Sequence, residues 1–216
     1  QKLNETLLRS FIKSQIYRVD HYLAKEAIDE IKKLHLEIKN LTSITIRSLE
    51  TAGVEKRAVF YDHVGALRDV GQNHLLATLS AVTGGMELAP ADPLLTVRGQ
   101  YEGYKNHERV PTDSQTETYF KITTSLLAQP ETVVVLESGK LMAEDRKEII
   151  IEQKGLPPNI ISLLSPRGHE YERILCALFA GDQSLFVRMK DTETAWRFVD
   201  PIIDSWKRGV PPLVIY

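Results

Sequence analysis

The sequence has little of several features that would assign it to a special class of protein. Its 216 residues include a single cysteine, Cys176, so no disulfide can form within the chain, which is usual in a reducing cytosol. No stretch reaches about 18 uninterrupted apolar residues, so we expect no membrane-spanning segment. The formal net charge of −2 provides no broad basic surface for nucleic acid. We therefore expect a cytoplasmic protein without nucleic-acid or membrane partners, in which any phosphate-binding site is local.

Two further absences concern nucleotide cofactors. The sequence contains neither a Gly-x-Gly-x-x-Gly turn nor a Walker-type phosphate loop, so nothing in this chain is expected to hold a nicotinamide. We assign no cofactor-binding and no metal-binding residue to it. The chain also begins without methionine, which favours a trimmed or excised piece, with a naturally short protein as the alternative. Cys176 lies in the apolar run of residues 174–179, which predicts a buried, unreactive thiol.

What is present is the composition of an ordinary globular domain, with 43% hydrophobic and 26% charged residues. Helical spacing of apolar residues predicts helices over residues 2–14, 20–35, 62–83 (ended by Gly84), 168–180 and 192–208. Alternating, β-branched runs predict strands over residues 43–50, 116–127, 132–136, 148–152 and 160–164. The later strands follow one another without intervening helices, which favours antiparallel pairing. The pattern predicts an α+β domain over residues 1–216, with a mixed, mostly antiparallel sheet and helices packed on one face.

The first informative segment covers residues 18–26. His21 and Lys25 are spaced i,i+4, so on a helix they share one face. If that helix begins with Asp20 as its N-cap, backbone N–H groups, an imidazole and an ammonium group converge at its positive end. Such a place favours a phosphate group. On the residues alone, a simple helix cap at Asp20 and a solvated Lys25 are the commoner arrangements.

The second informative segment lies in the predicted helix over residues 62–83. It brings Asp69, Asn73 and His74 together on a helix otherwise built for burial, as the following Leu75 indicates. An imidazole titrates near neutrality, so it can take a proton from a hydroxyl group, and a carboxylate can then orient it and stabilise its charge. The residues alone leave two interpretations open, a buried histidine with satisfied hydrogen bonds and a general base.

Both segments resemble signature segments of the glucose-6-phosphate dehydrogenase family. The first departs from the family's Arg-Ile-Asp-His-Tyr-Leu-Gly-Lys-Glu stretch only at Val19 and Ala24. The second matches a family stretch that supplies the catalytic base, at Tyr61, Asp62, Gly65, Arg68, Asp69, Gln72, Asn73, His74, Leu75 and Leu76. Further matches at residues 99–101, 114–120, 139–140 and 170–175 extend the resemblance almost from end to end.

The resemblance implies a role for individual residues. These are His74 as the catalytic base, Asp20 as the group that orients it, His21, Tyr22 and Lys25 on the 6-phosphate, Glu50 and Asp69 on sugar hydroxyl groups, and Lys140 on the substrate. A second cation follows Lys140 in the sequence, and the spacing leaves Arg146 and Lys147 equally open.

The implied reaction is oxidation of glucose 6-phosphate at C1 to the 6-phosphogluconolactone, the chemistry of the pentose phosphate pathway, with hydride transfer to NADP or NAD. The cofactor, which we expect to be NADP, would be held by a Rossmann domain that this chain lacks, in cis or in trans. Residues 1–18 would be a remnant of the connection to that domain. The family's sheet builds a dimer, and the sheet here looks shorter, so a homodimer through the sheet stays open. The alternative function is that of a non-catalytic sugar-phosphate-binding or regulatory relative.

Overall fold

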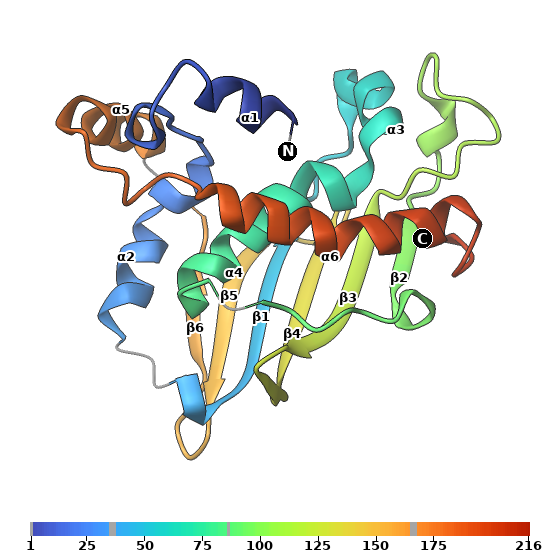
Figure 1. Ribbon diagram of the computed structural model, residues 1–216. Helices are drawn as coiled ribbons and strands as arrows, with labels where there is room; N and C mark the ends of the chain where they lie inside the picture. The colour runs from blue at the N-terminus through green and yellow to red at the C-terminus, as the bar shows by residue number, and fades with distance from the viewer. Residues whose placement is uncertain (1, 35–37, 86, 165–167) are drawn as a thin grey trace.

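The computed structural model describes residues 2–34, 38–85, 87–164 and 168–216, which form a sheet with helices packed against it (Figure 1). In these residues the sheet has seven strands in the order β6-β5-β1-β4-β3-β2-β7. The strands are β1 (Leu41–Leu49), β2 (Val97–Gln100), β3 (Tyr119–Leu126), β4 (Gln129–Gly139), β5 (Arg146–Gln153), β6 (Asn159–Ser162) and β7 (Val214–Ile215). The pairs β1–β4 and β2–β7 are parallel, and the other neighbours are antiparallel. The predicted mixed, mostly antiparallel sheet is confirmed, and the short strands β2 and β7 were not predicted.

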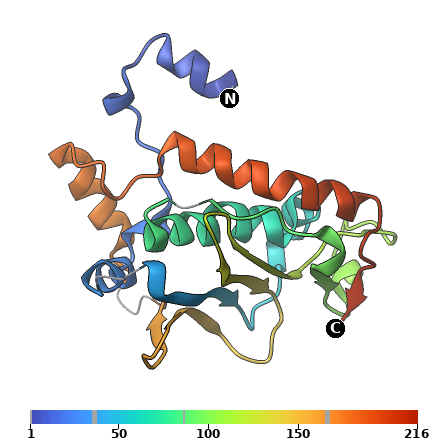
Figure 2. The ribbon, with the colours of Figure 1, turned by 60° about the horizontal axis from the view of Figure 1, so that its bottom comes forward.

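Helices cover one face of this sheet. The α-helices are α1 (Lys2–Leu8), α2 (Glu26–Lys33), α3 (Ala58–Ala66), α4 (Leu76–Thr83), α5 (Glu170–Ala180) and α6 (Met189–Lys207), with the π-helical segment η5 (Leu67–Leu75) between α3 and α4. Helix α1 stands away from the strands (Figure 2). Figures 1 and 2 show α4 and α6 lying across the same face of the strands, which confirms the predicted one-sided packing. Among the described residues, no helix combines the length and the apolar character that crossing a membrane requires.

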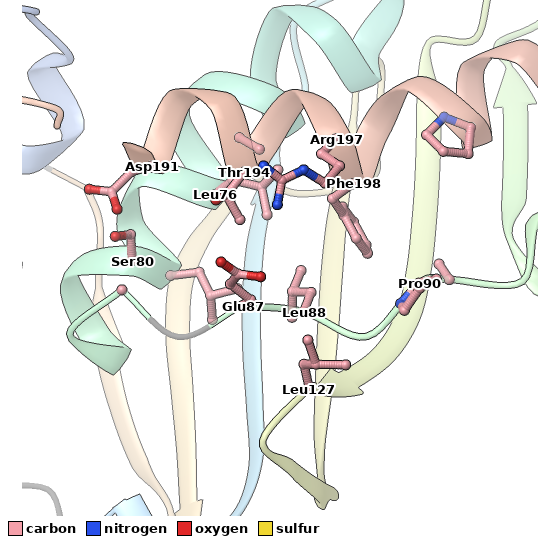
Figure 3. A pocket seen from close by; sticks show the side chains of 15 residues that line it. Leu76, Ser80, Glu87, Leu88, Pro90, Leu127, Asp191, Thr194, Arg197 and Phe198 are labelled. Atoms are coloured by element: carbon pink, nitrogen blue, oxygen red, sulfur yellow. The ribbon is translucent and has the colours of Figure 1, made fainter. Parts of the chain in front are cut away.

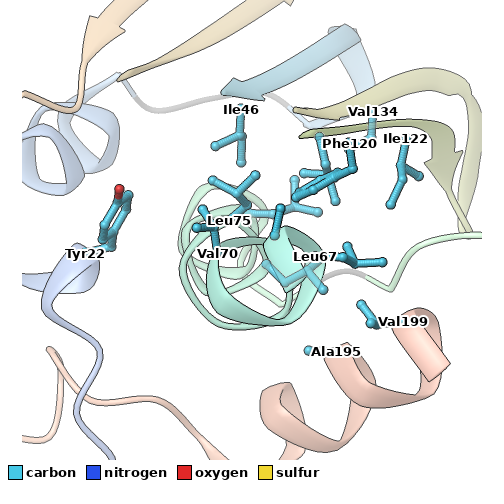
Figure 4. Packing of buried hydrophobic residues seen from close by; sticks show 14 of the residues in the cluster. Tyr22, Ile46, Leu67, Val70, Leu75, Phe120, Ile122, Val134, Ala195 and Val199 are labelled. Carbon is cyan, nitrogen blue, oxygen red and sulfur yellow. The ribbon is translucent and has the colours of Figure 1, made fainter. Parts of the chain in front are cut away.

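The core lies between the sheet and the segment formed by η5 and α4 (Figure 4). In β1, Ile44 and Ile46 are fully buried beneath the helices, whereas Thr45 between them points to the other face. Leu75 of η5 is also fully buried. Burial of each such side chain contributes about 1.5–3 kcal/mol of stability. This packing fixes the segment that carries His74 against the sheet.

The second predicted helix, over residues 20–35, has a different start. A 3₁₀ turn, η2 (His21–Ala24), comes first, and α2 begins only after Lys25. Lys25 has an extended backbone with ψ of 143°, so the prediction that His21 and Lys25 share a helix face is wrong. Asp20 is confirmed as an N-cap, because its Oδ1 accepts a hydrogen bond of 2.9 Å from Tyr22 N.

Two predictions about apolar segments are also wrong. The helix predicted over residues 2–14 forms over Lys2–Leu8 only, and most of the apolar side chains that predicted it are exposed, with Leu3 at 73%. Cys176 was expected to be buried but is exposed. Helix α5 turns Ile174 and Ala177 inward, and this places Cys176 on its solvent side. Only one side of α5 contacts the rest of the protein, so a continuous apolar run on this helix includes exposed residues.

The predicted continuous helix over residues 62–83 is interrupted at Gly65. Its φ of 76° and ψ of 164° break the helical path in a conformation that is open essentially to glycine alone. A Cβ atom at this position would lie 2.4 Å from Glu117 Oε1, so the close approach of that carboxyl group also requires glycine. The chain resumes as η5 and α4, and the predicted helix end at Gly84 is confirmed.

Glu117 makes the stability of this region depend on pH. Its Oε1 accepts a hydrogen bond of 3.0 Å from Leu67 N at the start of η5. Burial raises the pKa of Glu117 from 4.5 to about 7, although the bond from Leu67 acts in the other direction. Because the pKa is raised in the folded state, the unfolded chain loses this proton at lower pH. The stability that the protonated form provides is therefore complete below about pH 4.5 and is lost as the pH rises to about 7.

We expect Glu117→Gln to remove this pH dependence. In the unaltered protein the free energy of unfolding should fall by about 2–3 kcal/mol between pH 4.5 and 7 because of this group. The glutamine side chain does not ionise, so the variant should show a correspondingly smaller fall. Urea denaturation of both proteins across this range measures the difference. Parallel pH profiles for the two proteins would show that Glu117 is not the titrating group.

Candidate active site

The centre of the site is a histidine–aspartate pair formed by residues that lie 54 positions apart. His74 Nδ1 is 2.9 Å from Asp20 Oδ1 and 3.0 Å from Asp20 Oδ2, and the aspartate side chain is only 5% exposed. A carboxylate at this place accepts a hydrogen bond from Nδ1–H and so keeps the proton on Nδ1, which leaves Nε2 as the proton acceptor of the ring. The geometry therefore suits His74 for taking a proton from a bound hydroxyl group.

Two neighbouring rings enclose this pair. The Tyr22 ring stacks on the His74 ring with centroids 4.3 Å apart, and the His21 ring meets His74 edge-on at 4.7 Å. Burial raises the pKa of Tyr22, so its hydroxyl group stays protonated, and it lies 3.4 Å from Ser48 Oγ on β1. Burial, followed by the proximity of His74, lowers the pKa of His21 below its usual 6.5, so this ring is neutral at pH 7. Of these neighbours, Ser48 was not predicted from the sequence.

A second polar cluster, formed by Glu50, Lys140 and Lys147, lies at one end of the neighbouring strands β5, β1 and β4. Strands β1 and β4 are parallel and β5 is antiparallel to β1, so the ends of β1 and β4 meet the start of β5. Lys147 Nζ donates to Glu50 Oε1 at 2.6 Å, and Lys140 Nζ donates to Glu50 Oε2. Burial acts to raise the pKa of Glu50, but the hydrogen bonds from both lysines outweigh it, so the net pKa is lowered. Glu50 is therefore an ionised carboxylate between two cations.

The sequence left open whether Arg146 or Lys147 is the second cation, and their positions on β5 differ. Consecutive residues of a strand point to opposite faces. Lys147 points toward Glu50, whereas Arg146 is 46% exposed and pairs with Glu144 at 3.3 Å. Lys147 is thus the cation that joins Lys140 in this cluster.

Asp69 lies on η5, the segment that also carries His74. The i→i+5 hydrogen bonding of a π-helix brings residues five positions apart onto neighbouring turns, so Asp69 lies one turn before His74. Its carboxylate receives a hydrogen bond of 3.0 Å from Arg57 Nη2 and is 15% exposed. Asp69, predicted to bind a sugar hydroxyl group, is therefore already bonded to Arg57 at the start of α3.

Lys25 is buried beside Tyr22, next to the His74–Asp20 dyad, and is paired with an acidic residue that was not predicted to belong to the site. Its Nζ lies 3.2 Å from Glu170 Oε1, with each side chain 9% exposed, and 4.9 Å from the centroid of the Tyr22 ring. An acidic residue in the first turn of a helix is common because it complements the helix dipole, so Glu170 carried no special signal in the sequence.

One group in the described part of the chain has ligand atoms close enough to hold a metal ion. It consists of Asp20, His21 and His74, whose ligand atoms lie within 4.8 Å of one another. His74 and Asp20 already bond to each other. That this chain binds no metal ion remains a prediction from the sequence.

A cavity of about 300 Å³ between α4, α6 and the segment that follows α4 lies apart from these residues (Figure 3). Its walls are mainly apolar and include Leu76, Leu88 and Phe198, with Glu87 and Arg197 also among the lining residues. None of the predicted site residues lines it. The predicted site residues of the described chain therefore lie outside this cavity.

Two models of one protein family match the sequence. The family model described as glucose-6-phosphate dehydrogenase, C-terminal domain, matches residues 33–92 and 162–216. The chain belongs to the glucose-6-phosphate dehydrogenase family. The model of the family's NAD binding domain matches residues 1–30, which include the Asp20–Lys25 segment. The resemblance drawn from the two motifs is confirmed.

Relatives in this family are longer than the chain. Glucose-6-phosphate 1-dehydrogenase 1 of Mycobacterium tuberculosis (strain CDC 1551 / Oshkosh) is 31% identical over 279 residues, covering 94% of this chain and 59% of that protein. Glucose-6-phosphate 1-dehydrogenase of Helicobacter pylori (strain ATCC 700392 / 26695) is 28% identical, covering 95% of this chain and 60% of that protein. The chain thus spans about three fifths of the length of these dehydrogenases.

Solved structures of the family have the same fold. Glucose-6-phosphate 1-dehydrogenase from Mycobacterium avium superposes with a TM-score of 0.74 at 28% identity, covering all of this chain and 62% of the other. A glucose-6-phosphate dehydrogenase in complex with glucose-6-phosphate superposes with a TM-score of 0.86 at 23% identity, again over 100% of this chain and 62% of the other. At that lower identity the second likeness concerns the fold alone.

Proposed function

We propose that this chain forms the substrate-binding and base-supplying part of a glucose-6-phosphate dehydrogenase. The observation that carries the proposal is the His74–Asp20 pair, in which His74 Nδ1 bonds to the buried Asp20 carboxylate and the His74 ring lies against His21 and Tyr22. His74 would take the proton of the C1 hydroxyl group while the C1 hydrogen leaves as hydride to NADP, giving the 6-phosphogluconolactone. The protein's contribution is the positioning of the sugar and the transfer of one proton.

The substrate contacts follow from the residues around this pair. His21, Tyr22 and Lys25 would hold the 6-phosphate, since a neutral imidazole, a phenol and an ammonium group are all donors to phosphate oxygens. Glu50 and Asp69 would accept hydrogen bonds from sugar hydroxyl groups. Lys140 would contribute a further contact to the sugar, with Lys147 holding Glu50 from its other side.

NADP would be held by a Rossmann domain outside this sequence, in cis or in trans, because no Gly-rich phosphate turn is present here. Bound NADP would supply the group to which the hydride is transferred. The match of residues 1–30 to the family's NAD binding domain supports this arrangement. Exposed apolar side chains at the same end of the molecule, such as Leu3 at 73% and Phe179 at 86%, provide surface for such a domain. A cytoplasmic location fits the single cysteine.

We also propose that the uncovered face of the sheet can join two copies of the chain. It carries apolar side chains that remain exposed, including Val133 at 40% and Ile160 at 65%. Arg47 on the same face lies between Glu137 at 3.2 Å and Glu148 at 3.0 Å, so this charge is neutralised and does not oppose association.

A calorimetric titration with glucose 6-phosphate tests the proposed function. We expect weak binding to the unaltered chain and at least a tenfold loss with Lys25→Ala, because a charge-assisted contact to phosphate is removed. Lys32→Ala, an exposed lysine on α2, should bind like the unaltered chain and serves as the matched control. Absence of binding to the unaltered chain, or equal binding by both variants, would contradict the proposal.

A further inference from the structure

The predicted phosphate ligand Lys25 is held by a carboxylate of the same chain. The distance between Lys25 Nζ and Glu170 Oε1 is 3.2 Å, and neither side chain is more than 9% exposed. A charge pair this deeply shielded from water interacts more strongly than a surface pair. The Glu170 carboxylate therefore competes with the 6-phosphate for the Lys25 ammonium group.

The first turn of α5 covers a second phosphate ligand as well. Tyr171, which follows Glu170, stacks over the His21 ring with centroids 6.0 Å apart and an angle of 14° between the planes. The same helical turn thus contacts both His21 and Lys25. A phosphate monoester at pH 7 carries close to two negative charges, so it cannot share this space with an ionised Glu170 without repulsion.

Glu170 has a second cation within the reach of its own helix. Arg173 follows it by three residues, a spacing that places two side chains on neighbouring positions of one helix surface. Arg173 Nη2 donates to Asp29 at 2.5 Å, whereas its Nη1 is buried without a hydrogen-bond partner among the described residues. A cavity of about 540 Å³ is lined by Lys25, Glu170 and Arg173 together, so the carboxylate has room to move between the two cations.

We infer that Glu170 is a specificity-determining residue of the phosphate subsite. Its carboxylate pairs with Lys25 when no phosphate is bound and moves to Arg173 when a 6-phosphate takes its place. This exchange weakens the binding of a phosphorylated sugar and leaves the binding of the unphosphorylated sugar unchanged. Glu170 thereby reduces the discrimination between glucose 6-phosphate and glucose. The inference rests on the proposed function, because it assigns the phosphate to Lys25.

The test is the pair of dissociation constants for glucose 6-phosphate and glucose, measured by calorimetry on the unaltered chain and on two variants. Glu170→Gln keeps the shape and hydrogen-bonding groups of the side chain but removes its charge, and should bind glucose 6-phosphate about tenfold more tightly. Its affinity for glucose should change less than about twofold. Glu172→Gln on the same turn, where the side chain is 72% exposed, should alter neither affinity.

A double-mutant cycle with Arg173→Gln tests the movement of the carboxylate. Removing the alternative cation should weaken glucose 6-phosphate binding severalfold in the unaltered background and should have no effect in the Glu170→Gln background. If Arg173→Gln changes the affinity for glucose 6-phosphate by the same factor in both backgrounds, the carboxylate of Glu170 does not move to Arg173.

The outcomes separate this inference from the proposed function. Suppose that Lys25→Ala weakens the binding of glucose 6-phosphate but Glu170→Gln does not strengthen it. The role of Glu170 is then wrong, and the proposed function stands. A failure of both the unaltered chain and Glu170→Gln to bind glucose 6-phosphate would overturn both.

Discussion

Replacing His74 with asparagine is expected to lower kcat by about 10³- to 10⁴-fold when the chain is assembled with its nucleotide-binding domain. Asparagine fills a similar volume and can donate a hydrogen bond to Asp20, but it cannot accept the proton of the C1 hydroxyl group. General base catalysis supplies about 10²–10⁴ of an enzyme's rate, and loss of the paired orientation adds to this. The measurement is the rate of NADPH formation with saturating glucose 6-phosphate.

Two controls isolate the chemical step from folding and binding. His63→Asn alters an exposed histidine of α3, which bonds only to the carbonyl oxygen of Val59 among the contacts described, and should leave kcat unchanged. Calorimetry should give His74→Asn an affinity for glucose 6-phosphate within about threefold of the unaltered chain. A kcat for His74→Asn within tenfold of the unaltered protein would remove His74 from the role of base.

Gly65→Ala is expected to lower the free energy of unfolding by about 2–4 kcal/mol. The φ of 76° and ψ of 164° lie in a region that side chains avoid, which alone costs about 1–3 kcal/mol. The added Cβ would also lie 2.4 Å from Glu117 Oε1, and the carboxyl group could not move away without losing its bond to Leu67 N. Urea denaturation measures the loss.

Gly84→Ala provides the matched control for this substitution. Gly84 also has a positive φ, 71°, but its ψ of 18° is an ordinary left-handed helix end and no atom lies within 4 Å of an added Cβ. We expect it to cost about 1 kcal/mol. If Gly65→Ala lowers the free energy of unfolding no more than Gly84→Ala does, the contact with Glu117 does not contribute to the loss of stability.

The sequence predicted the strands well where the local pattern was strong. The alternation of Ile44 and Ile46 with polar residues reports one buried face, and this signal is local. Strands β2 and β7 have four and two residues, which is too short for any alternation to be recognised. They exist because neighbouring strands and the chain end supply their hydrogen-bond partners.

The interruption at Gly65 and the π-helical turn after it could not be predicted. The apolar spacing from Leu67 to Leu79 fits an ordinary helix, and glycine is tolerated in helices at modest cost. The cause of the break lies 52 residues away, where Glu117 takes the place that a side chain at Gly65 would need. Only the folded chain brings these two positions together.

The site residues came from the two motifs, but their partners did not. The pairing of His74 with Asp20 was implied by the family resemblance, since nothing in the spacing of 54 residues indicates it. The pairing of Lys25 with Glu170 spans 145 residues and left no trace in the sequence. The local expectation for Lys25, a helix face shared with His21, was wrong because a 3₁₀ turn replaces the first helical turn.

The most direct test of the account is a crystal structure of this chain with glucose 6-phosphate. The account predicts the C1 hydroxyl oxygen within about 3 Å of His74 Nε2. It also predicts the phosphate beside His21, Tyr22 and Lys25, with Glu170 displaced toward Arg173. A sugar bound in the reverse direction, or bound in the cavity between α4 and α6, would contradict it.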